Sequence, residues 1–394
     1  MKKIALLTFF LALISYSAVY CQNRSVDFNK KPFSDLLSMA KSQKKLIFMD
    51  AYADWCGPCK WMSANIFTND TVADYFNKTF ICAKFDMEKG EGIELSRRFN
   101  IKAYPTLLFI DGDGNMVHKR VGAPRQVKDY LEMGNVAITP GQGLAAVSKK
   151  YDAGSTDPEL LMLYLKRLQE AYMPVNEPLA KYMAAQKESE LTSAANWRLI
   201  YSYTEDMNSR EFKYLVSNQE NFARLYTVDS VDQKINDVYS RVLVMQTRSK
   251  QFSEENYNKT KQLIKESGYK SADKVIFMAD INLYLGRNLT DKFLESAYSG
   301  VEKYYANDYT TLNSFAWQVF SMTDEDKYLQ KAGEWAKRSF DLKSEAANSD
   351  TYAQILFKLG RKDEAIHYEK RAIELAKKEG IDSNEFEQTL LKMQ

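Results

Sequence analysis

Histidine, cysteine and net charge are all scarce in this chain of 394 residues. It contains two histidines, His118 and His367, and four cysteines. Two histidines exclude a histidine-rich metal centre, and four cysteines are too few to hold a protein of this size together by disulfides. The 54 Lys and Arg residues nearly balance the 52 Asp and Glu residues. Composition therefore gives no electrostatic reason to expect a nucleic-acid partner or an anionic membrane surface.

Proline is absent from the second half of the chain, because all eight prolines lie at or before Pro178. Proline interrupts helices, so a long proline-free region favours uninterrupted helical packing. The composition is 45% hydrophobic and 27% charged, which is typical of globular proteins and excludes disorder of the whole chain. The length predicts two or three domains.

The N-terminus has the pattern of a secretory signal peptide, which we place at residues 1–21. Lys2 and Lys3 precede an apolar run over 4–14, and smaller residues follow up to Cys21. This run is too short to cross a bilayer, which takes about 20 residues. Cleavage after Cys21 would release a protein that is exported to the periplasm, an oxidising compartment.

Two alternatives to soluble export remain open. Cys21 could be acylated and anchor a lipoprotein, although Tyr20 occupies the preceding position, where a small residue is usual. The leader could also be retained as an anchor.

Residues 22–136 are predicted to form a small α/β domain with a mixed sheet. Alternating apolar runs and helical periodicity place strands and helices in turn, and the sequence Asp111-Gly112-Asp113-Gly114 predicts a hairpin turn. The predicted strands are Leu46–Tyr52, Thr79–Phe85, Thr106–Ile110 and Met116–Val121, and the predicted helices are Phe33–Ser42, Cys59–Phe67, Ile93–Phe99 and Arg125–Met133.

The motif Trp55-Cys56-Gly57-Pro58-Cys59-Lys60 lies where a strand is predicted to lead into a helix. Two cysteines at this spacing can close a small disulfide. Cys56, at the helix N-terminus, faces unpaired N–H groups and the positive end of the dipole, which favour its thiolate. We expect Cys56 to attack and the more buried Cys59 to resolve the mixed disulfide. Pro58 suits the first helical turn.

Other interpretations of these cysteines have less support. A zinc site needs four ligands, and Cys82 and two distant histidines are the only other cysteine or histidine residues beyond Cys21. A purely structural disulfide is the second alternative. Cys82 lies in an apolar strand, which indicates a buried core residue, with a redox-sensitive thiol as the alternative.

Residues 45–135 resemble thioredoxin in this motif and in its surroundings. Within that superfamily, several flanking segments are similar to the C-terminal domain of the thiol:disulfide interchange protein DsbD. The resemblance implies that Asp50 is the buried carboxylate that moves the proton of Cys59, and that Lys84 pairs with it. An ordinary lysine at a strand edge is the alternative for Lys84.

The resemblance also implies a substrate groove and no cofactor beyond the Cys56–Cys59 disulfide. Tyr104-Pro105-Thr106 matches the family's cis-proline loop. Gly-Pro between the cysteines is the thioredoxin choice, and it favours reduction of clients over oxidation. The groove is expected to consist of Trp55, Gly57, Pro58, Tyr104, Pro105, Thr106 and Gly122.

Residues 137–143 are predicted to be a linker, and residues 144–394 an all-α helical-repeat domain. Its clearest part, 270–378, resembles tetratricopeptide repeats, although Glu369 occupies a position where a bulky apolar residue is usual. Small residues recur where paired helices would cross, and most of the aromatic residues are expected in the core. The recurring small residues are Ala297, Ala332 and Ala365. The aromatic residues expected in the core include most of Trp197, Trp317 and Trp335.

Two classes of function fit these observations. The first is an exported thiol:disulfide oxidoreductase that reduces client proteins, uses the helical domain to bind them, and depends on a membrane electron donor of the DsbD type. The second is a protein-binding scaffold or redox sensor in which the helical array is the main activity. Disulfide oxidase or isomerase activity would use the same site.

Overall fold

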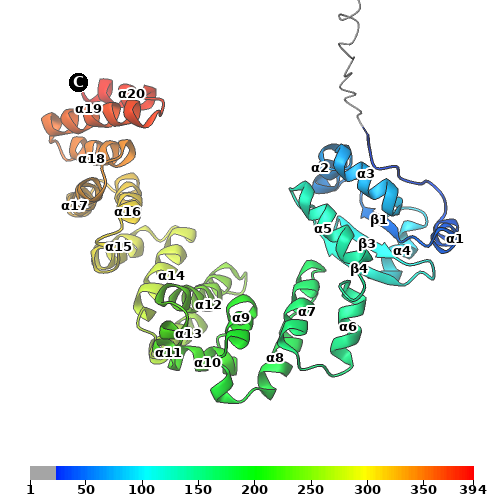
Figure 1. Ribbon diagram of the computed structural model, residues 1–394. Coiled ribbons are helices and arrows are strands. Elements are labelled where there is room, and N and C mark those ends of the chain that lie inside the picture. Colours follow the sequence, from blue (N-terminus) through cyan, green and yellow to red (C-terminus); the bar gives the residue numbers. More distant parts are fainter. Residues whose placement is uncertain (1–23) are drawn as a thin grey trace, which may run out of the picture. The chain divides into compact units, whose positions relative to one another are not determined.

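The computed structural model describes residues 24–394, so the predicted signal peptide and Cys21 lie outside the described residues. The chain forms two compact units that meet between Tyr203 and Thr204 in the sequence (Figure 1). No helix within 24–394 combines the length and apolar character needed to cross a membrane.

The first unit begins with an α/β domain. Its sheet has the order β2-β1-β3-β4, in which β1 runs parallel to β2 and antiparallel to β3, and β4 is antiparallel to β3. The predicted mixed sheet is confirmed. The elements are α1 (Phe33–Gln43), β1 (Ile47–Tyr52), α2 (Gly57–Asn65), α3 (Asp70–Thr79), β2 (Ile81–Asp86), α4 (Gly92–Arg98), β3 (Thr106–Ile110), β4 (Met116–Val121) and α5 (Val127–Ile138).

Both faces of this sheet are covered by helices. Alternate strand residues point to opposite faces, so Ile47 and Met49 face α1 and α4 while Phe48 faces α2, α3 and α5. The two resulting apolar layers are rich in phenylalanine, and Phe48 contacts Phe76 of α3 at 4.6 Å between ring centroids. This alternation places Asp50 on the same face as Phe48, directly below α2.

The sequence prediction omitted α3, although the helix carries a clear start signal. The side chain of Asn69 accepts hydrogen bonds from the backbone N–H groups of Thr71 and Val72, which is a normal N-cap. Val72 and Phe76, four residues apart, are both fully buried against the sheet. The predicted helix over 59–67 is α2, which begins two residues earlier than expected.

The helices that follow α5 continue the first unit. Two of them, α6 (Leu144–Asp152) and α7 (Pro158–Glu170), pack beside the edge strand β4. Gly143 permits this approach, because a Cβ there would lie 2.8 Å from the Val117 carbonyl oxygen. Arg167 donates a hydrogen bond to the Gln142 carbonyl oxygen at 2.9 Å. The remaining elements are α8 (Asn176–Ala185), a 3-10 turn (Glu188–Glu190) and α9 (Ala194–Tyr203).

The second unit is helical throughout, and its later part is built of helix pairs. This architecture fits a helical-repeat region and agrees with the prediction of repeats. The assignment to tetratricopeptide repeats stays a prediction. The helices are α10 (Arg210–Ser217), α11 (Gln219–Leu225), α12 (Val228–Arg248), α13 (Glu254–Glu266), α14 (Ala272–Gly286), α15 (Thr290–Tyr305), α16 (Tyr309–Met322), α17 (Asp326–Leu342), α18 (Ala346–Lys358), α19 (Lys362–Glu379) and α20 (Asn384–Met393).

Small residues lie at the helix crossings, as the spacing predicts. Ala297, Ala332 and Ala365 lie on α15, α17 and α19, and each is fully buried. The expectation that most of the aromatic residues lie in the core holds for two of the three tryptophans, one of which is Trp197 at 7% exposure. Trp335 is buried, whereas Trp317 is 42% exposed and contacts Phe320 on the surface of α16. Periodicity alone did not distinguish the two faces of α16, because both carry aromatic residues.

Glu369 lies in the interior between α18 and α19, where the repeat pattern led us to expect an apolar side chain. It is 0% exposed. Burial and the neighbouring carboxyl group of Asp350 raise the pKa of Glu369 to about 9. The folded protein therefore holds Glu369 neutral at physiological pH, and folding must take up a proton there.

This uptake predicts how stability depends on pH. Because the pKa of Glu369 is raised in the folded state, its contribution to stability declines as pH rises from the unfolded value through about 9. Glu369→Gln should thus raise the melting temperature by a few degrees at about pH 8 and change it little at about pH 4. Thermal unfolding of both proteins measures this.

The control is Glu374→Gln, which alters an exposed glutamate of the same helix that pairs with Arg371. It should show no comparable gain. An equal effect of Glu369→Gln at both pH values would contradict the raised pKa.

Candidate redox site

The two cysteines of the motif lie at the start of α2 and form a disulfide, with their Cα atoms 5.3 Å apart. Cys56 is the N-cap residue, and its Sγ accepts a hydrogen bond from the backbone N–H of Cys59 at 3.1 Å. Pro58 occupies the first helical turn, as expected. The structure thus places Cys56 where unpaired N–H groups and the helix dipole stabilise a thiolate.

The expected difference in burial between the cysteines is not present. Both residues are 2% exposed. Tyr52 and Tyr104 pack against the cluster that the two cysteines form with Ala53. Sequence position within the helix predicted the burial of Cys59 but could not reveal the two tyrosines.

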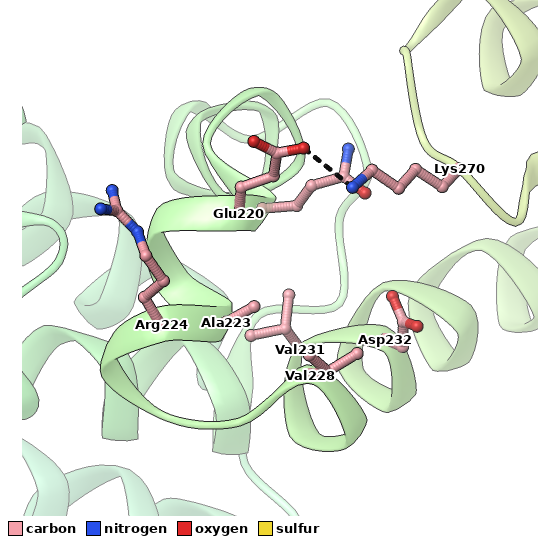
Figure 2. Close-up of a pocket in the computed structure, with 8 residues that line it drawn as sticks. Glu220, Ala223, Arg224, Val228, Val231, Asp232 and Lys270 are labelled. Atoms are coloured by element: carbon pink, nitrogen blue, oxygen red, sulfur yellow. Dashed lines mark hydrogen bonds and ion pairs between the residues drawn. The ribbon is translucent and has the colours of Figure 1, made fainter.

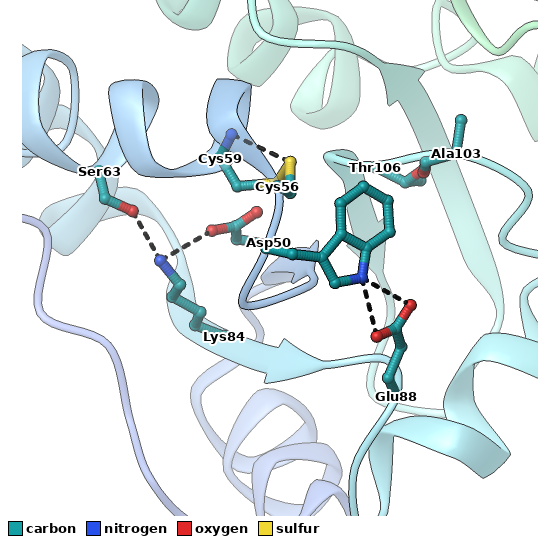
Figure 3. Close-up of a disulfide and its surroundings, with 9 residues drawn as sticks. Asp50, Cys56, Cys59, Ser63, Lys84, Glu88, Ala103 and Thr106 are labelled. Carbon is teal, nitrogen blue, oxygen red and sulfur yellow. Dashed lines mark hydrogen bonds and ion pairs between the residues drawn. A yellow bond between two sulfur atoms is a disulfide. The ribbon is translucent and has the colours of Figure 1, made fainter.

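Asp50 is wholly buried on the α2 side of the sheet (Figure 3). Burial raises its pKa from 3.8 to about 6, and the Lys84 ammonium opposes this shift. The register pairs Asp50 of β1 with Lys84 of β2, so both side chains emerge on one face. Lys84 Nζ lies 3.4 Å from Asp50 Oδ2. The partnership implied by the resemblance is therefore present in the fold.

Lys84 has further contacts that the sequence analysis missed. Its Nζ donates to the Ser63 hydroxyl at 2.6 Å and lies 4.5 Å from the centroid of the Tyr52 ring. Ser63 lies one helical turn after Cys59 on α2, so a helical spacing of four residues was the available signal. Although Lys84 is on an edge strand, these contacts distinguish it from an ordinary surface lysine.

The cis-proline loop and Gly122 lie side by side near the disulfide. The Tyr104–Pro105 peptide bond is cis. The Gly122 N–H donates to the Pro105 carbonyl oxygen at 2.8 Å, and Gly122 has φ +95°, which favours glycine. The Thr106 side chain is buried, and its hydroxyl donates to the Ala103 carbonyl oxygen at 2.7 Å. Thr106 thus supports the loop from inside.

Trp55 is 67% exposed beside the disulfide, together with the exposed Gly57 and Pro58. Its indole Nε1–H donates to the Glu88 carboxylate at 2.9 Å (Figure 3). The Trp55 ring meets Tyr104 edge-on at 5.8 Å. Sequence analysis did not select Glu88. The signal was its position: Glu88 follows the end of β2 and Trp55 follows the end of β1, and these two strands are parallel neighbours.

A cleft of about 350 Å³ opens between α2 and β2, and its lining includes Cys59, Ser63 and Lys84. Asp50 does not line it and lies behind Lys84. The Lys84 ammonium therefore lies at the cleft, whereas the Asp50 carboxyl is buried next to it. This arrangement suits proton exchange between solvent and the interior.

The third cysteine of the described chain is separate from this site. Cys82 is buried on β2 and unpaired, and burial raises its pKa to about 12. Burial therefore disfavours the reactive thiolate of Cys82, which is typical of a core residue. Within residues 24–394, no cluster of three or more His, Cys, Asp or Glu side chains could hold a metal ion.

A second hollow, of about 310 Å³, lies in the helical unit beside α11 and α12 (Figure 2). Lys270 and Glu220 form an ion pair across its rim at 2.8 Å. Both side chains are largely exposed to solvent, so the pair contributes little. The hollow brings together no nucleophile or catalytic base comparable to the cysteine site.

A disulfide at a helix N-terminus, with a buried carboxyl and a cis-proline loop beside it, defines a thiol–disulfide exchange protein. Residues 25–133 match the thioredoxin family model. The chain is 37% identical over 106 residues to a thioredoxin of Mycoplasmoides gallisepticum, which covers 26% of this chain and 95% of the relative. This chain belongs to the thioredoxin family.

Two further similarities concern the same region. The chain is 32% identical over 101 residues to the thiol:disulfide interchange protein DsbD of Yersinia pestis, over 24% of this chain. The match spans only 17% of the length of DsbD. A solved structure from Bacteroides thetaiotaomicron, described as a candidate disulphide isomerase, is 40% identical. It covers 30% of this chain and 98% of that chain with a TM-score of 0.28.

The raised pKa of Asp50 gives a prediction about stability. The folded state holds the Asp50 proton up to about pH 6, whereas the unfolded chain releases it near pH 4. Stability from this group is present below about pH 4 and is lost as pH rises through about 6. Asp50→Asn should therefore stabilise the protein by up to ~3 kcal/mol at neutral pH and have little effect at low pH.

Denaturant unfolding at several pH values measures this difference. Asp74→Asn, which removes an exposed carboxylate paired with Arg24, is the control and should not reproduce the pH dependence. If Asp50→Asn destabilised the protein at neutral pH, the unfavourable burial of a charge at this position would be disproved.

Proposed function

We propose that this protein is an exported thiol:disulfide oxidoreductase that reduces disulfides in client proteins. The observation that carries the proposal is the Cys56–Cys59 pair at the N-terminus of α2, next to a buried Asp50 that is linked to the cleft through Lys84. This combination provides a stabilised thiolate and a group that exchanges a proton close to neutral pH.

The reaction begins from the reduced dithiol. Cys56 thiolate attacks one sulfur of the client disulfide, a mixed disulfide forms, and the other client sulfur leaves as a thiolate. Cys59 then loses its proton to Asp50 and attacks Cys56 Sγ. The new Cys56–Cys59 bond releases the second client sulfur. Two electrons pass from the dithiol to the client, whose two thiolates take up protons.

The groove beside the disulfide suits an extended client segment. Trp55 and Tyr104 offer aromatic surface next to Cys56, and the Trp55–Glu88 hydrogen bond holds the indole in place. The Gly122 N–H and the Pro105 carbonyl are hydrogen-bonded to each other, and the space beside them is open, since nothing lies within 4 Å of a Cβ built at Gly122. These features support binding of client backbone next to the reactive sulfur.

The reducing direction is supported by Gly57-Pro58 between the cysteines, the dipeptide of thioredoxin, whose potential is about −270 mV. Export is supported by the leader pattern at residues 1–21, with a lipid anchor at Cys21 as the variant of this proposal. A reductase in the periplasm must be reduced again there. We propose a membrane donor of the DsbD type, since similarity to DsbD covers the redox region.

The helical region would select or hold the client. Helical-repeat regions commonly present a binding surface along the array. The exposed Trp317 on α16 supports a contact role for this part of the chain. The client is a disulfide-bearing protein, and no nucleic acid is involved.

The enzymatic part of the proposal predicts catalysed disulfide reduction by the chain. With a chemical reductant, the wild type should accelerate reduction of a model protein disulfide such as that of insulin. Cys56→Ser should show only the uncatalysed rate, because it lacks the attacking thiolate. Cys82→Ala should keep the wild-type rate. A wild type no faster than Cys56→Ser would exclude the enzyme and favour the scaffold.

Client selection predicts trapping of mixed disulfides. In Cys59→Ser, Cys56 can attack a client but the complex cannot be resolved, so clients should accumulate as covalent adducts in the native compartment. Non-reducing electrophoresis with mass spectrometry identifies them. Cys56→Ser/Cys59→Ser is the control. If no adducts form in the periplasm while they form readily in lysate, the assignment to exported clients is wrong.

A further inference from the structure

Ser63 and Asp50 compete for one ammonium group. Lys84 Nζ is 2.6 Å from Ser63 Oγ, which is a short hydrogen bond, and 3.4 Å from Asp50 Oδ2. Ser63 is on α2, one turn after Cys59, and Asp50 is on β1 below that helix. Figure 3 shows the ammonium between these two partners and the Asp50 carboxyl between Lys84 and the disulfide. The ammonium is thus held on the cleft side of the carboxyl.

The two oxygens of the Asp50 carboxyl lack hydrogen-bond donors within the described chain, and the residue is 0% exposed. Its one ionic partner among residues 24–394 is the Lys84 ammonium at 3.4 Å, although a buried carboxylate is a stronger acceptor than a neutral hydroxyl. The ammonium nevertheless lies closer to the Ser63 hydroxyl than to the Asp50 carboxyl, and 4.5 Å from the centroid of the Tyr52 ring.

We propose that Ser63 is a positioning residue of the redox site, whose hydroxyl holds the Lys84 ammonium in the cleft and keeps it from closing on Asp50. This inference rests on the proposed reductase function and adds a residue to its machinery. The Ser63 hydroxyl is hydrogen-bonded to the Lys84 ammonium. It acts through Lys84 alone.

The consequence concerns the proton that leaves Cys59. A full ion pair with Lys84 would make Asp50 a weaker base, because a nearby cation favours its charged form. By holding the ammonium back, Ser63 keeps the pKa of Asp50 near 6, where the group can both accept and return a proton. Tyr52 on β1 and Tyr130 on α5 also interact electrostatically with Asp50, and Cys59 on α2 titrates only after the disulfide is reduced.

The test is the pH profile of disulfide reduction by the full chain. Ser63→Ala should release the ammonium onto Asp50 and move the acid limb of the profile to lower pH by about half a unit, a roughly threefold change in ionisation constant. Ser63→Thr retains a hydroxyl and should restore the wild-type midpoint. Ser38→Ala, which alters an exposed serine of α1, should leave it unchanged.

Two results would overturn the proposal. One is a midpoint in Ser63→Ala that equals the wild type or lies higher. The other is a midpoint that shifts as much when Ser63→Ala is introduced into the Lys84→Met variant as when it is introduced into the wild type. The proposed effect requires the Lys84 ammonium, so it should be absent in that background.

A spectroscopic measurement keeps this inference separate from the proposed function. The infrared band of the protonated Asp50 carboxyl, assigned by its loss in Asp50→Asn, can be titrated without any client. If the wild type proved inactive, the reductase function would fail, while a lower titration midpoint in Ser63→Ala would still support the positioning role. An unchanged midpoint in an active enzyme would refute the positioning role alone.

Discussion

The burial of one carboxyl group, Asp50, is the constraint around which the redox site is organised. An isolated charge in this position would be costly, so the protein raises the pKa of Asp50 and supplies a single cation from the neighbouring strand. Parallel pairing of β1 with β2 brings Lys84 to the same face, and α2 covers both groups. The helix that seals Asp50 is also the helix whose N-terminus carries Cys56. Burying Asp50 therefore lowers the stability of the fold at the position where proton transfer is needed. Ionisable groups with shifted pKa values are common at functional sites.

Much of this site was predictable from sequence because its parts are local or carry strong signals. The first turn of α2 fixes the relative positions of Cys56, Pro58 and Cys59. The strand pattern placed Asp50 in the sheet. Lys84 and the cis bond at Pro105 came from the resemblance to thioredoxin, since no short-range rule identifies either. The mixed sheet followed from alternating strand and helix signals, and the omission of α3 followed from overlooking the Asn69 cap.

The features that sequence analysis missed depend on contacts between distant segments. Ser63 and Glu88 gain their roles from Lys84 and Trp55, which lie 21 and 33 residues away. The equal burial of the two cysteines, against which Tyr52 and Tyr104 pack, and the exposure of Trp317 on α16 also depend on tertiary packing. Glu369 could be recognised as unusual for its position, but its neutral state depends on Asp350 of the adjacent helix.

The central claim is that the Cys56–Cys59 pair works as a reductant, and its equilibrium reduction potential tests this most directly. Equilibrating the full chain with glutathione or dithiothreitol buffers and quantifying the two thiols by alkylation gives the value. We expect a potential close to that of thioredoxin, about −270 mV, because the pair shares the Gly-Pro dipeptide and no histidine precedes Cys59 to stabilise the thiolate further. A potential near that of strong oxidants, about −120 mV, would contradict the reductase assignment and identify a disulfide donor instead.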